Sequence, residues 1–90
     1  MTEAEFKERA VPIFAAEPSE ESTQALRGLM RKASETISIA RIAILSAEAL
    51  DEAYPSVTAM LGMMGQPTAA ERMTVEVAEG RIKDRLDRLN

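Results

Sequence analysis

The side chains of this sequence that could take part in catalysis or metal binding are mainly carboxylates. Histidine and cysteine are absent, which removes thiol nucleophiles, imidazole bases and the commonest zinc ligands. Neighbouring acids occur, such as Asp51 with Glu52, but they lack the spacing of a calcium loop, and no glycine-rich phosphate cradle is present. We therefore expect no enzyme, no catalytic residue, no cofactor, no metal site and no small-molecule substrate.

Acidic residues are concentrated at the start of the chain. Residues 1–21 hold six glutamates against Lys7 and Arg9, and the net charge of −4 arises there because the remainder is balanced. Such an arm could dock on a basic partner or imitate a nucleic-acid backbone. Glutamates are also typical of the first turn of a helix, where the positive end of the helix dipole favours a carboxylate. We favour the second interpretation.

Hydroxyl and proline residues mark where helices begin and end. Thr2, Ser19 and Thr68 precede apolar patterns of helical spacing, and a hydroxyl at that position accepts a hydrogen bond from a free backbone amide. Prolines follow each of the first three segments and predict their ends, and Pro12 is expected to kink or interrupt the first helix. The sequence predicts one all-α domain over residues 1–90, a small helical bundle with four segments: an acidic N-terminal helix or arm (1–18), one long central helix (19–54), a short helix (55–66) and an amphipathic C-terminal helix (67–90).

The central segment carries the strongest pattern. Apolar side chains recur at alternating steps of four and three residues from Leu26 to Tyr54, which is the spacing of a helix-packing seam. Isoleucines within residues 36–45 make a strand the rival interpretation, but strong helix formers surround them and no second strand is available for pairing. Between Ile37 and Leu45 the helix is apolar on nearly every side, and so short a chain has little else to cover it. We expect a homo-oligomer, with a twofold-symmetric dimer favoured, in which the interface residues are Ile37, Ile39, Ala40, Ile42, Ile44 and Ala47.

The predicted core takes large apolar residues from every segment. Its members are Phe6, Phe14, Leu26, Met30, Ile37, Ile44, Leu50, Leu61, Ile82 and Leu86. Three methionines, Met60, Met63 and Met64, fall within the short third segment. Methionine can form an adaptable binding surface, but it also fills irregular gaps in a core, and we favour core filling here.

The C-terminal segment contains a run with a family resemblance. Residues 77–86, Val-Ala-Glu-Gly-Arg-Ile-Lys-Asp-Arg-Leu, are similar to the recognition helix of helix-turn-helix regulators of the sigma-region-4 and LuxR type. The resemblance covers about fifteen residues and implies that Ile82 and Leu86 are buried anchors. It also implies groove and phosphate contacts by four bases, Arg81, Lys83, Arg85 and Arg88. Arg72 and Glu76 stand where that family has a small residue and the turn glycine, so we favour an ordinary amphipathic helix with alternating arginine and aspartate.

Our leading hypothesis is a non-enzymatic helical module for protein–protein interaction and oligomerisation. It would act as an adaptor, an assembly factor or a small inhibitor of a macromolecular protein partner. The alternative is a nucleic-acid-binding regulator or DNA-packaging factor that uses the basic C-terminal helix. No run of about 18 apolar residues occurs, and the N-terminus is acidic, so we expect no membrane span, no signal peptide and a cytoplasmic location.

Overall fold

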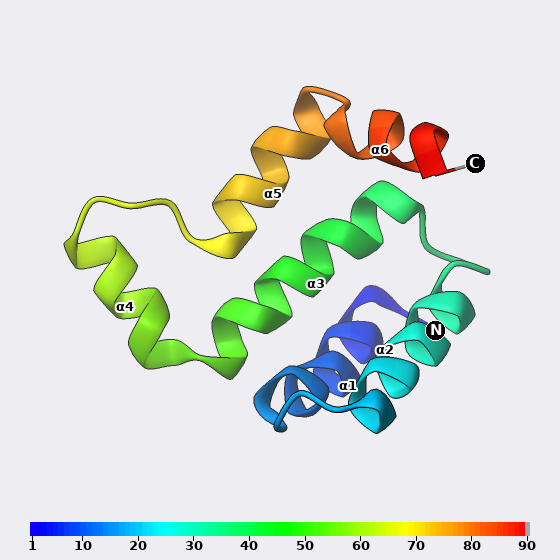
Figure 1. Cartoon of the computed structure of the whole chain (residues 1–90), viewed down its shortest axis with the longest axis horizontal. Helices are drawn as coiled ribbons and strands as arrows, with labels where there is room; N and C mark the ends of the chain where they lie inside the picture. Colours follow the sequence, from blue (N-terminus) through cyan, green and yellow to red (C-terminus); the bar gives the residue numbers. More distant parts are fainter. Residues whose placement is uncertain (90) are drawn as a thin grey trace.

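The chain is helical throughout the part that the structure describes (Figure 1). The computed structural model describes residues 1–89, without the side chains of Leu86 and Leu89. Its helices are α1 (Glu3–Ala15), α2 (Glu20–Ala33), α3 (Ile39–Ala53), α4 (Pro55–Met63), α5 (Ala69–Ala78) and α6 (Arg81–Leu89). No strand occurs within residues 1–89, so the prediction of an all-α fold is confirmed. None of the helices described there is long and apolar enough to cross a membrane.

The three predicted helix starts are confirmed. Each hydroxyl accepts a hydrogen bond, 3.1–3.3 Å long, from the backbone amide three residues further on, in the pairs Thr2–Glu5, Ser19–Ser22 and Thr68–Glu71. α1 continues through Pro12 to Ala15, so the proline does not interrupt it.

The prediction of one long central helix is wrong, because residues 34–38 separate it into α2 and α3. Hydroxyl side chains in this stretch compete with the hydrogen bonds of a continuous helix. The Ser38 hydroxyl caps α3 by accepting from the Arg41 backbone amide at 3.2 Å. The Thr36 hydroxyl donates to the Met1 carbonyl at 2.9 Å and ties the break to the start of the chain. The break allows α2 to pack on α1 while α3 passes α1 as a separate helix.

The predicted C-terminal helix is also divided. α5 ends at Ala78 and α6 begins at Arg81, because Gly80 has a φ of +74°, in the left-handed region that ends a helix. Gly65, with a φ of +69°, follows the end of α4 at Met63. The four predicted segments are therefore six helices within residues 1–89.

α3 lies at the centre of the fold, between α1 and α5 (Figure 1). α2 packs against α1, α4 leaves the end of α3, and α6 follows α5. The core forms mainly where α1, α2 and α3 meet. Its buried apolar residues are Phe6, Ala10, Ala33, Ile37, Ile42, Leu45, Ala47 and Ala49.

The predicted core is confirmed in part. Phe6 and Ile37 are buried as predicted. The half-buried members of the predicted set are Phe14, Leu26, Met30, Ile44, Leu61 and Ile82. Leu50 is 37% exposed and its assignment to the core is wrong. The break before α3 explains the difference, since α3 no longer has to present the same face as α2. The side chain of Leu86 lies outside the described residues.

Polar contacts fasten α1 alongside α3. Arg41 Nε lies 2.8 Å from a carboxylate oxygen of Glu3, and Lys7 Nζ lies 3.1 Å from Glu52 and 3.7 Å from Glu48. The hydrogen bond with Glu52 raises the pKa of Lys7 above its ordinary value of 10.5. Glu3 near the start of α1 pairs with Arg41 near the start of α3, and Lys7, further along α1, pairs with Glu48 and Glu52, further along α3. The two helices therefore run parallel. Part of the acidic N-terminal charge thus serves the chain's own packing.

Candidate interaction surface

Asp51, in the last turn of α3, holds the start of α5. Its carboxylate accepts hydrogen bonds from the backbone amides of Ala69 at 3.1 Å and Ala70 at 3.0 Å. The Asp51 carbonyl also accepts a hydrogen bond of 2.9 Å from the Thr58 hydroxyl in α4. The chain therefore leaves α3 near Asp51, passes through α4 and returns to the same residue (Figure 1). α4 therefore belongs to the segment between α3 and α5, here called the excursion, and the two ends of this segment are held close together.

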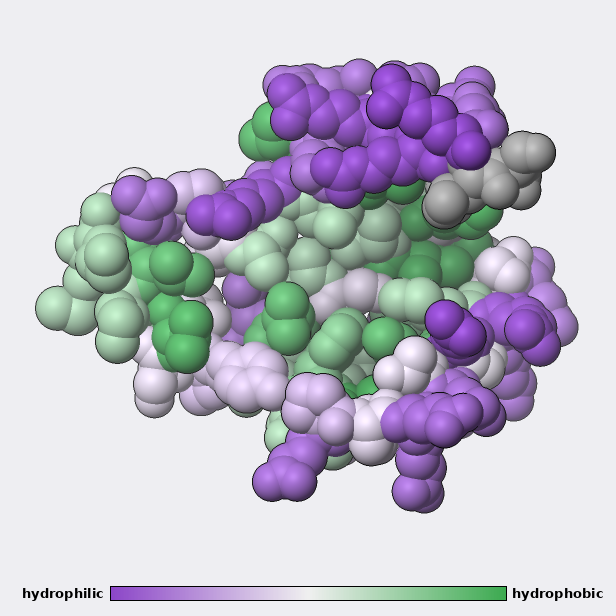
Figure 2. Space-filling model, viewed as in Figure 1, coloured by the Kyte–Doolittle hydropathy of each residue, from purple (hydrophilic) through white to green (hydrophobic). Residues whose placement is uncertain are grey.

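α4 exposes its apolar side chains. None of its residues is buried, and the exposed fractions are 54% for Val57, 57% for Met60 and 89% for Met63. Met64, which follows the helix, is 65% exposed. We call these four residues the α4 surface, and Figure 2 shows hydrophobic residues gathered at the end of the molecule where α4 lies. The expectation that these methionines fill the core is wrong, because the excursion carries them away from it.

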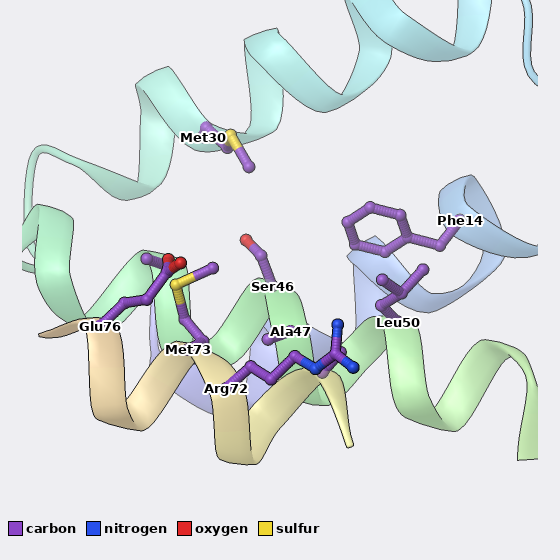
Figure 3. A pocket seen from close by; sticks show the side chains of 10 residues that line it. Phe14, Met30, Ser46, Ala47, Leu50, Arg72, Met73 and Glu76 are labelled. Carbon is purple, nitrogen blue, oxygen red and sulfur yellow. The ribbon is translucent and has the colours of Figure 1, made fainter. Parts of the chain in front are cut away.

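An apolar groove of about 460 Å³ runs along α3, between α2 and α5, and we call it the α3 groove. Its floor comes from α3, and its walls come from α5, α2 and the end of α1 (Figure 3). The floor residues are Ala43, Ser46, Ala47 and Leu50. The main wall residues are Phe14, Met30 and Met73.

The α3 groove holds few polar groups. Ser46 Oγ is shielded from water and has no hydrogen-bond partner, and it points from α3 toward Met30 (Figure 3). Arg72 and Glu76 lie on the α5 side, where Glu76 also forms an ion pair of 3.2 Å with Arg85. The other residues that line the α3 groove are apolar, and an apolar lining favours contact with an apolar group.

A smaller hollow of about 270 Å³ lies at the other end of α3. Ile39 and Ala40 contribute to it from α3, and Val77 and Ile82 contribute from α5 and α6. Ile39 is 57% exposed. One face of α3 is therefore incompletely covered from Ile39 to Leu50, and hydrophobic residues show between the hydrophilic flanks in Figure 2.

The structure separates the six predicted interface residues. Ile37, Ile42 and Ala47 are buried within this chain. Ile39 and Ala40 are exposed, and Ile44 is half-buried. None of the six predicted interface residues lies in α4, although a signal was present in this segment. The segment 55–64 contains no charged residue, which is unusual for a helix that faces water.

The four bases predicted to contact nucleic acid share α6. Arg81 pairs with Glu79 at 2.7 Å, and Arg85 pairs with Glu76 at 3.2 Å. Lys83 and Arg88 are exposed. The turn at Glu79 and Gly80 divides the run that resembles a recognition helix, because Val77 and Ala78 belong to α5 and the run continues in α6 from Arg81. The ion pairs, however, place two carboxylates among the four bases.

No group of three or more acidic residues within the described part of the chain could hold a metal ion. No family model, no curated protein and no solved structure matches this sequence or its fold. The α4 surface and the α3 groove are therefore the features of this chain that indicate a function.

Proposed function

We propose that this chain is a non-enzymatic helical module that binds protein partners and associates with itself, with a dimer favoured. It acts as an adaptor, an assembly factor or a small inhibitor, and its contact region is the exposed apolar surface of α4 and α3. One observation carries this proposal: α4, a helix of 9 residues, has no buried residue and no charged residue.

A solvated surface helix ordinarily has polar or charged residues on its outer face. α4 instead turns Val57, Met60 and Met63 toward water, each more than half exposed. Contiguous exposed apolar patches of this kind mark sites of contact with another macromolecule. Because Asp51 holds both ends of the excursion, α4 is presented at a defined place on the fold.

The available burial is large enough to support a dimer. The α4 surface has four side chains per copy, on average about two-thirds exposed, and complete burial of one such side chain contributes roughly 1.5–3 kcal/mol. Covering both copies would contribute on the order of 8–16 kcal/mol. This is comparable with the roughly 4–15 kcal/mol of lost freedom that opposes association. Burial of Ile39, which is 57% exposed on α3, would favour the dimer further.

Light scattering across a concentration series tests the proposal. We expect the wild-type chain to have the mass of a dimer at high micromolar concentration. Met63→Asp should shift the mass to that of a monomer while the helical circular dichroism stays unchanged, because Met63 is 89% exposed. Gln24→Asp adds the same charge at an exposed position of α2 and should remain dimeric. A wild-type chain that stays a folded monomer would contradict the proposal.

Nucleic-acid binding is the second candidate function, and the turn at Gly80 favours it. This turn makes α6 a separate short helix that carries four bases, Arg81, Lys83, Arg85 and Arg88. The pairs of Arg81 and Arg85 with glutamates weaken the case, because those carboxylates repel phosphates. A mobility-shift assay at low salt decides it. A shift that falls with salt and is lost on alanine substitution of Arg81, Lys83 and Arg85 would place this function first.

A further inference from the structure

The two sides of α3 are covered unequally. α1 and α2 lie on one side, and α5 and α6, here called the C-terminal arm, lie on the other (Figure 1). The core cluster consists of buried residues between Phe6 and Ala49, and none of its described members belongs to the arm. No residue of α5 is buried, and the arm borders both the α3 groove and the smaller hollow. The arm therefore contributes less apolar burial than α1 and α2 do.

Polar contacts hold the arm at one end. Within the part of the chain that the structure describes, only two hydrogen bonds join the arm to the first three helices, from the amides of Ala69 and Ala70 to the Asp51 carboxylate. No ion pair joins the arm to those helices there. By comparison, α1 makes polar contacts with later residues near both of its ends, through Glu3 and the Phe14 carbonyl. The arm is therefore held at the start of α5 by polar contacts and beyond that point by packing on α3.

Ala47 of α3 lies on the side that the arm covers. It is 6% exposed, yet it is not a member of the core cluster. It lines the α3 groove together with Arg72 and Met73 of α5. Ala49, two residues further along α3, is fully buried and belongs to the core cluster. The two alanines therefore depend on different coverings: Ala49 is covered within the core, and Ala47 is covered in part by the arm.

We infer that the C-terminal arm is a hinged cover, which swings away from α3 about Asp51 while α1, α2 and α3 stay folded. Segments that bury little apolar surface open locally at a lower cost in free energy than the core of a domain does. The two bonds to Asp51 lie in the first turn of α5 and form the pivot. The core cluster on the other side of α3 does not depend on the arm and stays intact during the opening.

The opening changes which part of α3 is exposed. It joins the α3 groove and the smaller hollow into one apolar face that includes Ile39, Ala40, Ala43 and Ala47. All of these except Ala43 belong to the six interface residues that the sequence predicts. The arm thus regulates how much of α3 is available for contact. This consequence rests on the proposed function, whereas the opening itself is a property of a single chain.

Cysteine labelling tests the opening, because the natural chain contains no cysteine. Ala47→Cys places a thiol under the arm, and Ala49→Cys places a thiol in the core as the matched control. Each variant, checked for folding by circular dichroism, is mixed at low protein concentration with an excess of an aromatic disulfide reagent. We expect Ala47→Cys to react at least about tenfold faster than Ala49→Cys, with a weaker dependence on urea, because local opening exposes less surface than unfolding does. Ala33→Cys, also in the core, replaces Ala49→Cys if that variant does not fold.

A second substitution separates opening of the arm from direct access of the reagent through the groove. Asp51→Ala removes the polar contacts at the pivot, and the loss of hydrogen bonds to a charged group should speed the labelling of Ala47→Cys at least about tenfold. Glu52→Ala breaks an ion pair between α1 and α3 that the opening does not disturb. Glu52→Ala should therefore leave the labelling rate of Ala47→Cys unchanged.

Two results would overturn the inference. Equal labelling rates of Ala47→Cys and Ala49→Cys would mean that the arm leaves α3 only when the whole chain unfolds. Faster labelling of Ala47→Cys that Asp51→Ala does not change would mean that the reagent reaches this thiol while the arm is closed. Both results concern a single chain, so they are distinct from a failure of the proposed self-association, which light scattering measures.

Discussion

Replacement of Asp51 by alanine removes the side chain that joins the end of α3 to the start of α5. Four backbone amides at a helix start have no partner within the helix. In α5 the Asp51 carboxylate accepts from Ala69 and Ala70, and the Thr68 hydroxyl accepts from Glu71. Without the carboxylate, two partly buried amides lose their acceptor and α5 loses its link to α3.

The expected loss is large for a chain of this size. A lost cap costs roughly 0.5–2 kcal/mol, and a hydrogen bond to a charged group contributes about 1.5–3 kcal/mol. We therefore expect Asp51→Ala to lower the free energy of unfolding by about 2–4 kcal/mol. Since each kcal/mol shifts the Tm of a small domain by about 4–8 °C, the Tm should fall by about 8–32 °C. Asp51→Asn keeps one acceptor oxygen and should lose about 1 kcal/mol.

Urea unfolding followed by circular dichroism measures these differences. Glu52→Ala is the matched control, because it removes the neighbouring carboxylate and breaks only the partly exposed ion pair with Lys7. Exposed pairs of this kind contribute less than about 1 kcal/mol. If Asp51→Ala is no more destabilising than Glu52→Ala, the Asp51 carboxylate does not hold the start of α5 in place.

Three further predictions concern the fold. Ile42→Asp should unfold the chain because Ile42 is 6% exposed, whereas Ile39→Asp should stay helical by circular dichroism because Ile39 is 57% exposed. Equal circular dichroism of the two variants would contradict the assigned burial. Gly80→Ala should destabilise the chain by about 1 kcal/mol, because alanine disfavours a positive φ. Gly28→Ala, in α2 with open space around it, should stabilise the chain by roughly 0.5–1 kcal/mol. Urea midpoints that move in the same direction for both variants would refute this contrast. The pKa of Lys7 is raised on folding, so the contribution of Lys7 to stability is present below pH 10.5 and is lost as the pH rises through the higher pKa of the folded state. The urea midpoints of the wild type and of Lys7→Met should therefore converge above pH 10.5. Urea midpoints that stay parallel across this pH range would refute the prediction.

The helix starts could be predicted because their causes lie within a few residues. Thr2, Ser19 and Thr68 each cap a helix through a hydrogen bond to an amide three residues away. The break at residues 34–38 also had a local signal in its hydroxyl residues, but the apolar spacing on both sides concealed it. One of its hydrogen bonds, from Thr36 to the Met1 carbonyl, joins residues 35 positions apart and has no local trace.

The candidate site was harder to predict than the fold. Apolar spacing shows which residues avoid water in a helix, but it does not distinguish burial within the chain from burial against a partner. Ile42 and Ile39 share one segment and one residue type, yet Ile42 is 6% exposed and Ile39 is 57% exposed. The methionines of α4 were assigned to the core for the same reason, although the absence of charge in residues 55–64 was already visible.

The all-α class and the three helix caps could be predicted from the sequence, because they depend on backbone preferences and on hydrogen bonds between near neighbours. Which face of α3 is covered, and whether α4 is exposed, depends on contacts between residues that are distant in the chain. Asp51 binds amides 18 and 19 residues away, and Tyr54 binds a carbonyl 40 residues away. The pattern of neighbouring residues in the sequence does not encode these contacts. As a result of them, the α4 surface and the α3 groove lie exposed on the outside of the chain.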